Sequence, residues 1–386
     1  MQFIDLAAQQ KRIRRKIEAN LGRVLEHGQY VLGPEVGELE ERLAALVGAP
    51  HALGCASGTD ALLLALLALK IGPGDAVLMP AFTFFAGAEV VMLLGATPVF
   101  VDIASDTYNL DPVKLERAAV AARTADPRLH PLPEHPSGPL RPRAVLAVDL
   151  FGLPADYEAI NALAQEEGLT VIEDAAQSLG GRRQGRWAGA LAPLGATSFY
   201  PSKPLGAYGD AGMVFSSEAE LDAVMRSLRM HGMGAHSYDH LRVGLNARLD
   251  TLQAAVLLAK LDIFEEELAL RQEVAGRYQR LLAKAPGLRL PQVPAGSVSA
   301  WAQYSVLAAE PARRQELRER LAQAQVPTAV HYPKPLHLQE ACAPLGYRPG
   351  DFPVAEYIAE RIFSLPMHPY LEAADQERIA ALLAQE

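Results

Sequence analysis

The stretch Leu169-Thr170-Val171-Ile172-Glu173-Asp174-Ala175-Ala176-Gln177-Ser178 places two carboxylates directly after a short apolar run. A run of this kind predicts a buried strand, and its carboxyl end lies at the edge where open α/β sheets bind ligands. Three similar runs come earlier, at residues 76–79, 97–101 and 144–148. Helical stretches at residues 58–70, 112–122 and 156–167 separate them. From about residue 21 to residue 217 the chain therefore predicts a mostly parallel sheet covered by helices on both faces.

The C-terminal part follows a different pattern. An amphipathic pattern at residues 250–285 predicts one long linking helix. Beyond it the sequence predicts strands at 304–308 and 328–331, and helices at 313–325 and from about 374 onward. The expected organisation is a large domain over residues 1–250, and a linking helix with a smaller α/β domain over residues 251–386.

The segment 124–142 interrupts this pattern with six prolines and little hydrophobic periodicity. Such a proline content predicts an extended, exposed loop. His130 and His135 lie within it, but no further ligands stand at a suitable spacing, so no metal site is expected.

Composition narrows the class of protein. The 386 residues suffice for a full core, and no run approaches the ~20 apolar residues of a membrane span. The N-terminus lacks a signal-peptide core, and two cysteines are too few for a disulfide framework or a structural zinc site. A cytoplasmic protein is expected. The net charge of −9 argues against nucleic acid as a general partner.

Lys203 stands in a Pro/Gly-rich turn after an apolar strand, within Thr197-Ser198-Phe199-Tyr200-Pro201-Ser202-Lys203-Pro204-Leu205-Gly206. A lysine that forms a Schiff base must be held still and kept partly out of water. Lys334 lies between two prolines, and the other six lysines lie in stretches typical of polar helix faces or ends: Lys11, Lys16, Lys70, Lys114, Lys260 and Lys284. On this segment alone, a solvated loop lysine is an equal alternative.

Other motifs supply groups that a cofactor would need. A carboxylate such as Asp174 can keep a heteroaromatic nitrogen protonated, although it could also cap the next turn. Ser57-Gly58-Thr59 opens a helix whose N-terminus suits a phosphate, or is an ordinary cap. Phe82, Phe84 and Phe85 offer an aromatic face or fill the core.

Two later motifs could contact a substrate. Gly244-Leu245-Asn246-Ala247-Arg248-Leu249-Asp250 offers donors to a phosphate or carboxylate, or is a loop before a helix cap. Val330-His331-Tyr332-Pro333 lines a pocket or forms a surface turn.

Taken together, these motifs resemble the fold-type I, pyridoxal-phosphate-dependent sugar aminotransferases of the DegT/StrS type. The resemblance also covers the start Phe3-Ile4-Asp5-Leu6, the run Leu32-Gly33-Pro34-Glu35-Val36 and the run Ser364-Leu365-Pro366-Met367-His368-Pro369-Tyr370. It therefore extends over nearly the whole chain.

The resemblance implies roles around pyridoxal 5'-phosphate (PLP). Lys203 would bind the cofactor and then move the proton, and Asp174 would pair with the pyridine nitrogen. Gln177 would contact the ring hydroxyl, and Phe84 would stack on the ring. The phosphate would be held by Gly58, Thr59 and Ser198. Asn246 would reach the phosphate of a neighbouring subunit, which makes a homodimer with shared sites.

Within the family, the segments around Arg248, His331 and Tyr332 resemble aminotransferases acting on UDP-2-acetamido-2-deoxy-3-oxo-glucuronate. These enzymes use L-glutamate to make a 3-amino sugar for bacterial surface polysaccharides such as O-antigen. By that resemblance the three residues would meet the uronate carboxylate. Two departures stand out: the insert at 124–142 is longer than usual, and Ser57 replaces a frequent Asn.

Three alternatives remain open at this stage. One is amination of another keto sugar, such as a dTDP- or GDP-linked deoxysugar. A second is a pyridoxamine-dependent sugar dehydratase, but those relatives replace the lysine that Lys203 retains. A third is a PLP-binding regulator without turnover, against which the intact set Lys203, Asp174 and Gln177 argues.

Overall fold

The computed structural model describes residues 1–134, 139–236 and 238–385. Over these residues the chain builds a seven-stranded sheet in the order β1-β9-β8-β5-β4-β2-β3. β9 runs antiparallel to both neighbours, and the other pairings in this sheet are parallel. The strands are β1 His51–Cys55, β2 Asp75–Pro80, β3 Thr97–Val101, β4 Arg141–Val148, β5 Thr170–Asp174, β8 Leu194–Ser198 and β9 Gly212–Ser216.

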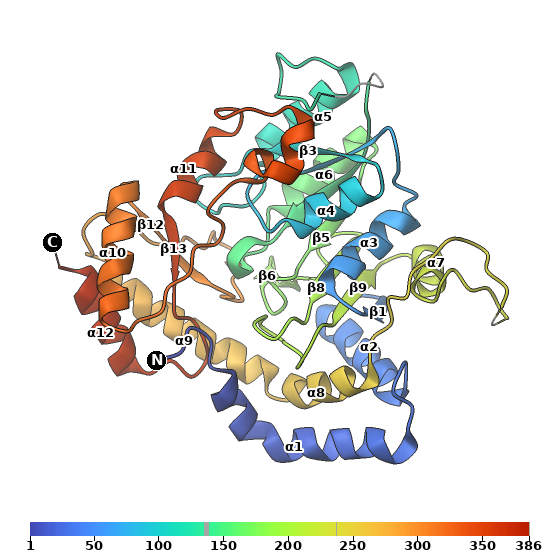
Figure 1. Ribbon diagram of the computed structural model, residues 1–386, viewed down its shortest axis with the longest axis horizontal. Helices are drawn as coiled ribbons and strands as arrows, with labels where there is room; N and C mark the ends of the chain where they lie inside the picture. Colours follow the sequence, from blue (N-terminus) through green and yellow to red (C-terminus); the bar gives the residue numbers. More distant parts are fainter. Residues whose placement is uncertain (135–138, 237, 386) are drawn as a thin grey trace.

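Helices cover both faces of this sheet, as the alternating pattern predicts (Figure 1). One apolar core joins α3, α4 and α7 to the sheet, and a second joins α5 and α6 to its other face. α2 packs on β1 at the sheet's end. The helices of this layer are α2 Pro34–Val47, α3 Gly58–Ala68, α4 Ala86–Leu93, α5 Pro112–Thr124, α6 Tyr157–Glu167 and α7 Ala219–Arg229, with a 3-10 turn, η1, at Leu150–Gly152.

The predicted single helix at 250–285 is wrong in one respect, because two helices occupy this stretch. α8 (Thr251–Leu261) and α9 (Phe264–Leu282) are separated at Asp262 and Ile263. Ile263 has ψ of 3°, which leaves the helical region and redirects the chain. The N-terminal helix α1 (Leu6–His27) packs along α8 (Figure 1).

The C-terminal part forms a three-stranded antiparallel sheet, β10-β12-β13, against α9, α10 and α12. The strand predicted at 328–331 is wrong, since the structure has only an isolated bridge there between Ala329 and Ser364. A third small sheet has the order β11-β6-β7. It pairs β11, from the C-terminal part, with β6, which lies between β5 and β8 in the chain. These elements are β6 Arg182–Arg183, β7 Arg186–Trp187, β10 Leu288–Arg289, β11 Ser297–Val298, β12 Tyr304–Ala308, α10 Pro311–Gln323, η2 Leu336–Leu338, η3 Glu340–Leu345, α11 Pro353–Arg361, β13 Ile362–Leu365 and α12 Ala373–Leu383.

The described part of the proline-rich segment forms a mostly exposed connection between α5 and β4, as predicted, but a few of its residues are buried. His130 is buried, and its Nε2 lies 2.7 Å from the carbonyl oxygen of Phe100, to which it donates. The amide of Glu134 donates to the carbonyl of Leu345 at 2.8 Å. Residues 135–138, including His135, lie outside the described residues. The segment is therefore attached to the protein at these two points, while much of its described part stays exposed.

None of the helices in the described ranges combines the length and apolar character that crossing a membrane would require.

Candidate active site

Lys203 lies in a closed turn directly after β8. Its amide donates to the carbonyl of Tyr200 at 2.9 Å, and the amide of Ala207 donates to the carbonyl of Phe199 at 2.7 Å. A Cβ at Gly206 would lie 2.4 Å from the carbonyl oxygen of Pro201, so the turn admits only glycine there. The sequence signal is thereby explained: the turn holds the lysine backbone still.

Asp174 ends β5, the strand next to β8, and pairs in register with Ala196. Its Oδ1 accepts a hydrogen bond from the amide of Ala176 at 3.1 Å. Burial raises the pKa of this carboxyl, and the nearby Lys203 ammonium opposes the rise. Burial also lowers the pKa of Lys203, an effect that Asp174 opposes. The amine is thus moved toward its neutral, nucleophilic form beside a carboxylate.

The two carboxylates of the quoted motif have different surroundings. Glu173 is fully buried, and its two oxygens accept from the amides of Gly189 at 2.6 Å and Leu191 at 2.7 Å. Asp174 faces the strand edge that carries Lys203. Glu173 therefore fixes the loop before β8, and Asp174 is the carboxylate of the two that acts on Lys203.

A candidate phosphate cradle lies where the chain passes from β1 to α3. Ser57 caps α3, because its Oγ accepts from the amide of Asp60 at 3.0 Å. This leaves the amides of Gly58 and Thr59 in the helix's first turn, where helices have no internal acceptor. A Cβ at Gly58 would lie 2.6 Å from the Cβ of Ser198, so glycine lets the helix start approach the end of β8. The three residues expected to hold a phosphate are thus adjacent.

Gln177 links the sheet edge to the C-terminal part. Its Oε1 accepts from the amide of Phe151 at 2.8 Å, and its Nε2 donates to the hydroxyl of Tyr332 at 3.0 Å. The ring of Tyr332 lies 6.1 Å from those of both Phe82 and Phe84. Phe82 is buried, whereas Phe84 is 59% exposed, so Phe84 is the aromatic residue free to cover a ligand.

His331 approaches the same site. Its Nδ1 lies 3.1 Å from the Oγ of Ser364, which in turn contacts the Oγ of Ser305 at 2.9 Å. Burial lowers the pKa of His331, and the positive charge of Lys203 lowers it further. Its ring centroid lies 6.2 Å from that of Phe3. The start of the chain, at Phe3, therefore lies beside His331, a candidate substrate-binding residue.

Asn246 and Arg248 lie on a segment that runs beside the end of β1. Arg248 forms an isolated bridge with Cys55, and the carbonyl of Ala247 accepts from the amide of Ala56 at 3.1 Å. Asn246 is exposed and Arg248 half-buried. Within the described ranges the Arg248 guanidinium has no hydrogen bond or ion pair, so it is available to a ligand.

Two supporting residues carry no clear signal in the sequence. The amide of Phe151 donates the hydrogen bond that orients Gln177. Asp149, two residues earlier, holds that turn, because its carboxylate accepts from Ser178 Oγ at 2.6 Å and from the Tyr157 hydroxyl at 2.8 Å. Asp149 directly follows the predicted strand at 144–148, and this position at a strand end is the signal that could have found it.

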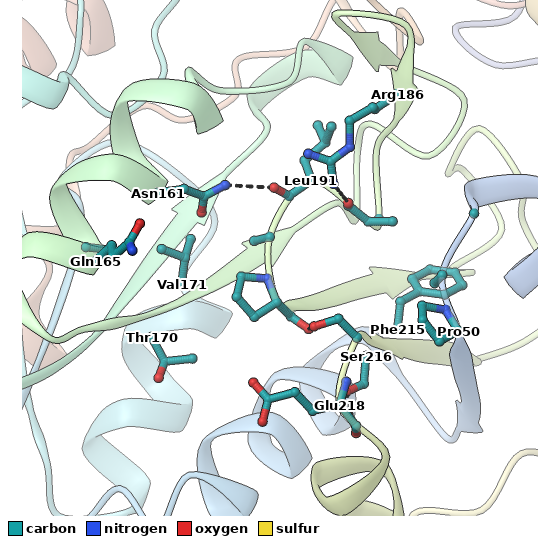
Figure 2. Close-up of a pocket in the computed structure, with 18 of the residues that line it drawn as sticks. Pro50, Asn161, Gln165, Thr170, Val171, Arg186, Leu191, Phe215, Ser216 and Glu218 are labelled. Atoms are coloured by element: carbon teal, nitrogen blue, oxygen red, sulfur yellow. Dashed lines mark hydrogen bonds between the residues drawn. The ribbon is translucent and has the colours of Figure 1, made fainter.

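A separate pocket of about 590 Å³ lies at the opposite end of the strands. Figure 2 shows residues that line it, including Pro50, Thr170 and Ser216, which stand before β1, at the start of β5 and at the end of β9. None of the candidate residues lines it. The candidate residues Asp174, Ser198 and Lys203 lie instead at or just after the carboxyl ends of β5 and β8, where such sheets bind ligands.

A lysine of lowered pKa, a carboxylate beside it and a helix N-terminus at one sheet edge are features of a PLP-dependent aminotransferase. Comparison with known proteins agrees. The model of the DegT/DnrJ/EryC1/StrS aminotransferase family matches residues 11–384. The chain belongs to this family, whose members are PLP-dependent sugar aminotransferases.

Three similar proteins cover nearly the whole chain. The UDP-2-acetamido-2-deoxy-3-oxo-D-glucuronate aminotransferase of Pseudomonas aeruginosa is 49% identical over 99% of both chains. The UDP-N-acetyl-3-dehydro-alpha-D-glucosamine 3-aminotransferase of Acidithiobacillus ferrooxidans is 40% identical, over 99% of this chain and 96% of its own. The crystal structure of a family aminotransferase from Brucella abortus has a TM-score of 0.92 and 48% identity, over 99% of this chain and 98% of its own. The predicted fold class is therefore confirmed.

Proposed function

We propose that this enzyme transfers the amino group of L-glutamate to the 3-keto group of a UDP-linked N-acetylated hexuronate. The observation that carries this proposal is the 49% identity, over 99% of both chains, to the Pseudomonas enzyme named for that substrate. A half-buried Arg248 without a partner of its own among the described residues is consistent with a substrate that carries a carboxylate. The product would be a 3-amino sugar nucleotide, made in the cytoplasm for surface polysaccharide such as O-antigen.

The residues at the sheet edge fit PLP by their chemistry. Lys203 offers an amine to the aldehyde, Asp174 a carboxylate to the ring nitrogen, and Gln177 an amide to the ring oxygen. Phe84 offers an aromatic face. Gly58, Thr59 and Ser198 would bind the phosphate of the cofactor. When bound, PLP supplies an aldehyde that takes up an amino group and a ring that stabilises negative charge on the substrate carbon.

Lys203 then has two tasks. Its amine would hold the cofactor, and once freed by glutamate it would move the proton at the substrate carbon. The lowered pKa supports both tasks, because a neutral amine can accept that proton. Asp174 would keep the ring nitrogen protonated, and the two half-reactions would use the same site in turn.

Arg248, His331 and Tyr332 would recognise the sugar acid. A guanidinium forms two parallel hydrogen bonds with a carboxylate, which fixes its orientation. Tyr332 is held by Gln177, and His331 by Ser364, so both side chains are preorganised. Keto sugars without a carboxylate, such as dTDP- or GDP-linked deoxysugars, would gain nothing from Arg248.

We propose a homodimer with shared active sites. Asn246 is exposed on the chain's own surface, which supports a contact with the partner's phosphate. Several large apolar side chains are also exposed, and a subunit interface could cover them: Phe84 59%, Tyr200 54%, Leu241 61% and Val243 93%. Mixed dimers of Asn246→Ala and Lys203→Ala chains should regain activity, and absence of complementation would exclude a shared site.

We also propose the division of the chain at about residue 250. Residues 1–250 would form the PLP-binding domain, and residues 251–386 the linking helices and a smaller domain. A separate apolar core, which includes Tyr278, Tyr304 and Phe363, supports this division.

The decisive experiment follows the visible spectrum of the purified protein with PLP. Adding L-glutamate should remove the absorption band of the lysine-bound cofactor, and the UDP-linked 3-keto-glucuronate should restore it. Loss without return would leave an aminotransferase for another keto sugar. A band that no amino donor changes would favour the regulator, and absence of a band would contradict the assignment of Lys203.

A further inference from the structure

Lys260 is the most unexpected titratable group outside the site. It lies in α8 and is 1% exposed, although its sequence context is typical of a polar helix face. Among the described residues its Nζ has no hydrogen-bond acceptor. A buried ammonium without an acceptor is costly, so the fold would be more stable with an apolar side chain there.

The ammonium instead lies over an aromatic ring. Its Nζ is 4.4 Å from the ring centroid of Tyr208, a geometry in which the face of the ring attracts a cation. The surroundings are apolar, with Ile13 and Ile17 of α1 packed against Val256 of α8. The hydroxyl of Tyr208 is also buried without a partner, so the ring, not the hydroxyl, makes the contact.

The nearest opposite charge is already engaged elsewhere. Glu267 of α9 acts electrostatically on Lys260, but its carboxylate accepts from Gln9 Nε2 at 2.7 Å and from the hydroxyl of Tyr370. Neither oxygen is within hydrogen-bond distance of Lys260. The ring of Tyr208 is therefore the direct partner of the ammonium.

Tyr208 is where the turn that carries Lys203 meets α8. The turn closes through the amide of Ala207, and the next amide, of Tyr208, donates to Gln253 Oε1 of α8 at 2.9 Å. A Cβ at Gly209 would lie 3.0 Å from Gln253 Nε2, so the chain passes close against this helix. One backbone hydrogen bond and one ring–ammonium contact thus attach the turn to α8, along which α1 also packs (Figure 1).

We propose that Lys260 is a positioning residue that fixes the turn of the catalytic lysine through the ring of Tyr208. The inference rests on the proposed role of Lys203 in binding PLP. The ammonium holds the ring in one place, and the ring holds the end of the turn against α8. A charge kept in the core at a cost to stability is what a positioning role would require.

The proposal gives a pair of effects with opposite signs. In Lys260→Met the side chain has similar length and no charge, so the whole protein should become harder to unfold. The turn should at the same time become more mobile, since methionine holds the ring less firmly than the ammonium does. A residue with a purely structural role would not loosen the turn while stabilising the fold.

The test uses hydrogen exchange of the cofactor-free, full-length protein. In Lys260→Met the amides of Lys203 and Ala207 should exchange about tenfold faster, while amides of the central sheet exchange more slowly. Tyr208→Leu should give the same acceleration, the double variant no more than either, and Tyr208→Phe should retain the protection. Lys284→Met, at an exposed lysine beyond the end of α9, is the matched control. Unchanged exchange in the turn, or equal acceleration along all of α8, would overturn the proposal.

A second measurement separates this inference from the proposed function. The rate of PLP loss from the loaded protein should rise about tenfold in Lys260→Met and stay unchanged in Lys284→Met. If the wild-type protein binds no PLP through Lys203, the proposed function fails. If wild-type protein binds PLP and the variant releases it at the wild-type rate, the positioning role fails.

Discussion

Burial lowers the pKa of two lysines, the half-buried Lys203 in the turn after β8 and the buried Lys260 in α8. They differ in what surrounds the amine. Lys203 lies at the carboxyl edge of the sheet beside Asp174, whereas Lys260 lies inside the helix layer over an aromatic ring. The comparison teaches that burial alone does not make a lysine reactive. A reactive lysine must also lie where a ligand can reach it, with a carboxylate placed to interact with that ligand.

The largest expected effect comes from removing the reactive amine. Lys203→Ala should reduce turnover by at least about 10⁴-fold, because no other group can bind the cofactor and move the proton. Steady-state kinetics measures the loss, and thermal unfolding should show a folded protein. Full activity in this variant would contradict the assignment of Lys203 as the reactive lysine.

The next largest effects should distinguish the two neighbouring carboxylates, Glu173 and Asp174. Asp174→Ala should lose about 3–4 kcal/mol of transition-state stabilisation with little change in the free energy of unfolding. Glu173→Ala should instead destabilise the fold by about 2–4 kcal/mol, since two buried amides lose their acceptor. Kinetics and denaturant unfolding on both variants check this. If the two variants behaved alike, the division between a site residue and a structural residue would be wrong.

Arg248 should affect one half-reaction only. Arg248→Ala should raise the KM for the keto-uronate by ~10–100-fold, the loss of one charge-assisted pair. The half-reaction with glutamate should stay near the wild-type rate if the uronate carboxylate is its ligand. Single-turnover spectroscopy of each half-reaction distinguishes them. Equal losses in both would place Arg248 in general cofactor or glutamate binding.

The smallest expected effect is a pH dependence of stability due to Lys260. Burial lowers its pKa from 10.5 to about 8, so the folded protein binds this proton less tightly than the unfolded chain. The cost is fully present below pH 8 and is relieved as pH rises from 8 to 10.5. Lys260→Met should therefore be more stable than wild type by about 1–3 kcal/mol at pH 7, and the difference should shrink toward pH 10. A difference that is constant with pH would contradict the buried charge.

Much of the fold could be predicted because strands and helices that alternate leave a strong local pattern. The strand at 304–308 and the helix starts near Gly58 and Pro112 agree with the structure. The break at Ile263 was missed because a short kink leaves the amphipathic period almost unchanged. The bridge at Ala329 was predicted as a strand because partner strands, not local sequence, decide whether an extended segment pairs.

At the candidate site, too, the sequence predicts some features and the tertiary structure decides others. The sequence places Lys203, Asp174 and Gln177 by their motifs, but it treats Phe82, Phe84 and Phe85 as equivalent and cannot separate Glu173 from Asp174. Exposure and hydrogen-bond partners distinguish them. The roles of Phe151 and Ser364 were missed because each acts through a neighbour that is distant in the chain.

By itself the sequence determined the class of fold, the family and the groups available for chemistry, because periodicity and motifs are local properties of the chain. Only the tertiary structure decided which of these groups meet, which aromatic residue stays exposed and which lysine is buried. Lys260 shows why: a helix position gives no sign of which face α1 and the Tyr208 ring will cover. Burial, and with it the charge state of a side chain, depends on contacts between segments far apart in sequence.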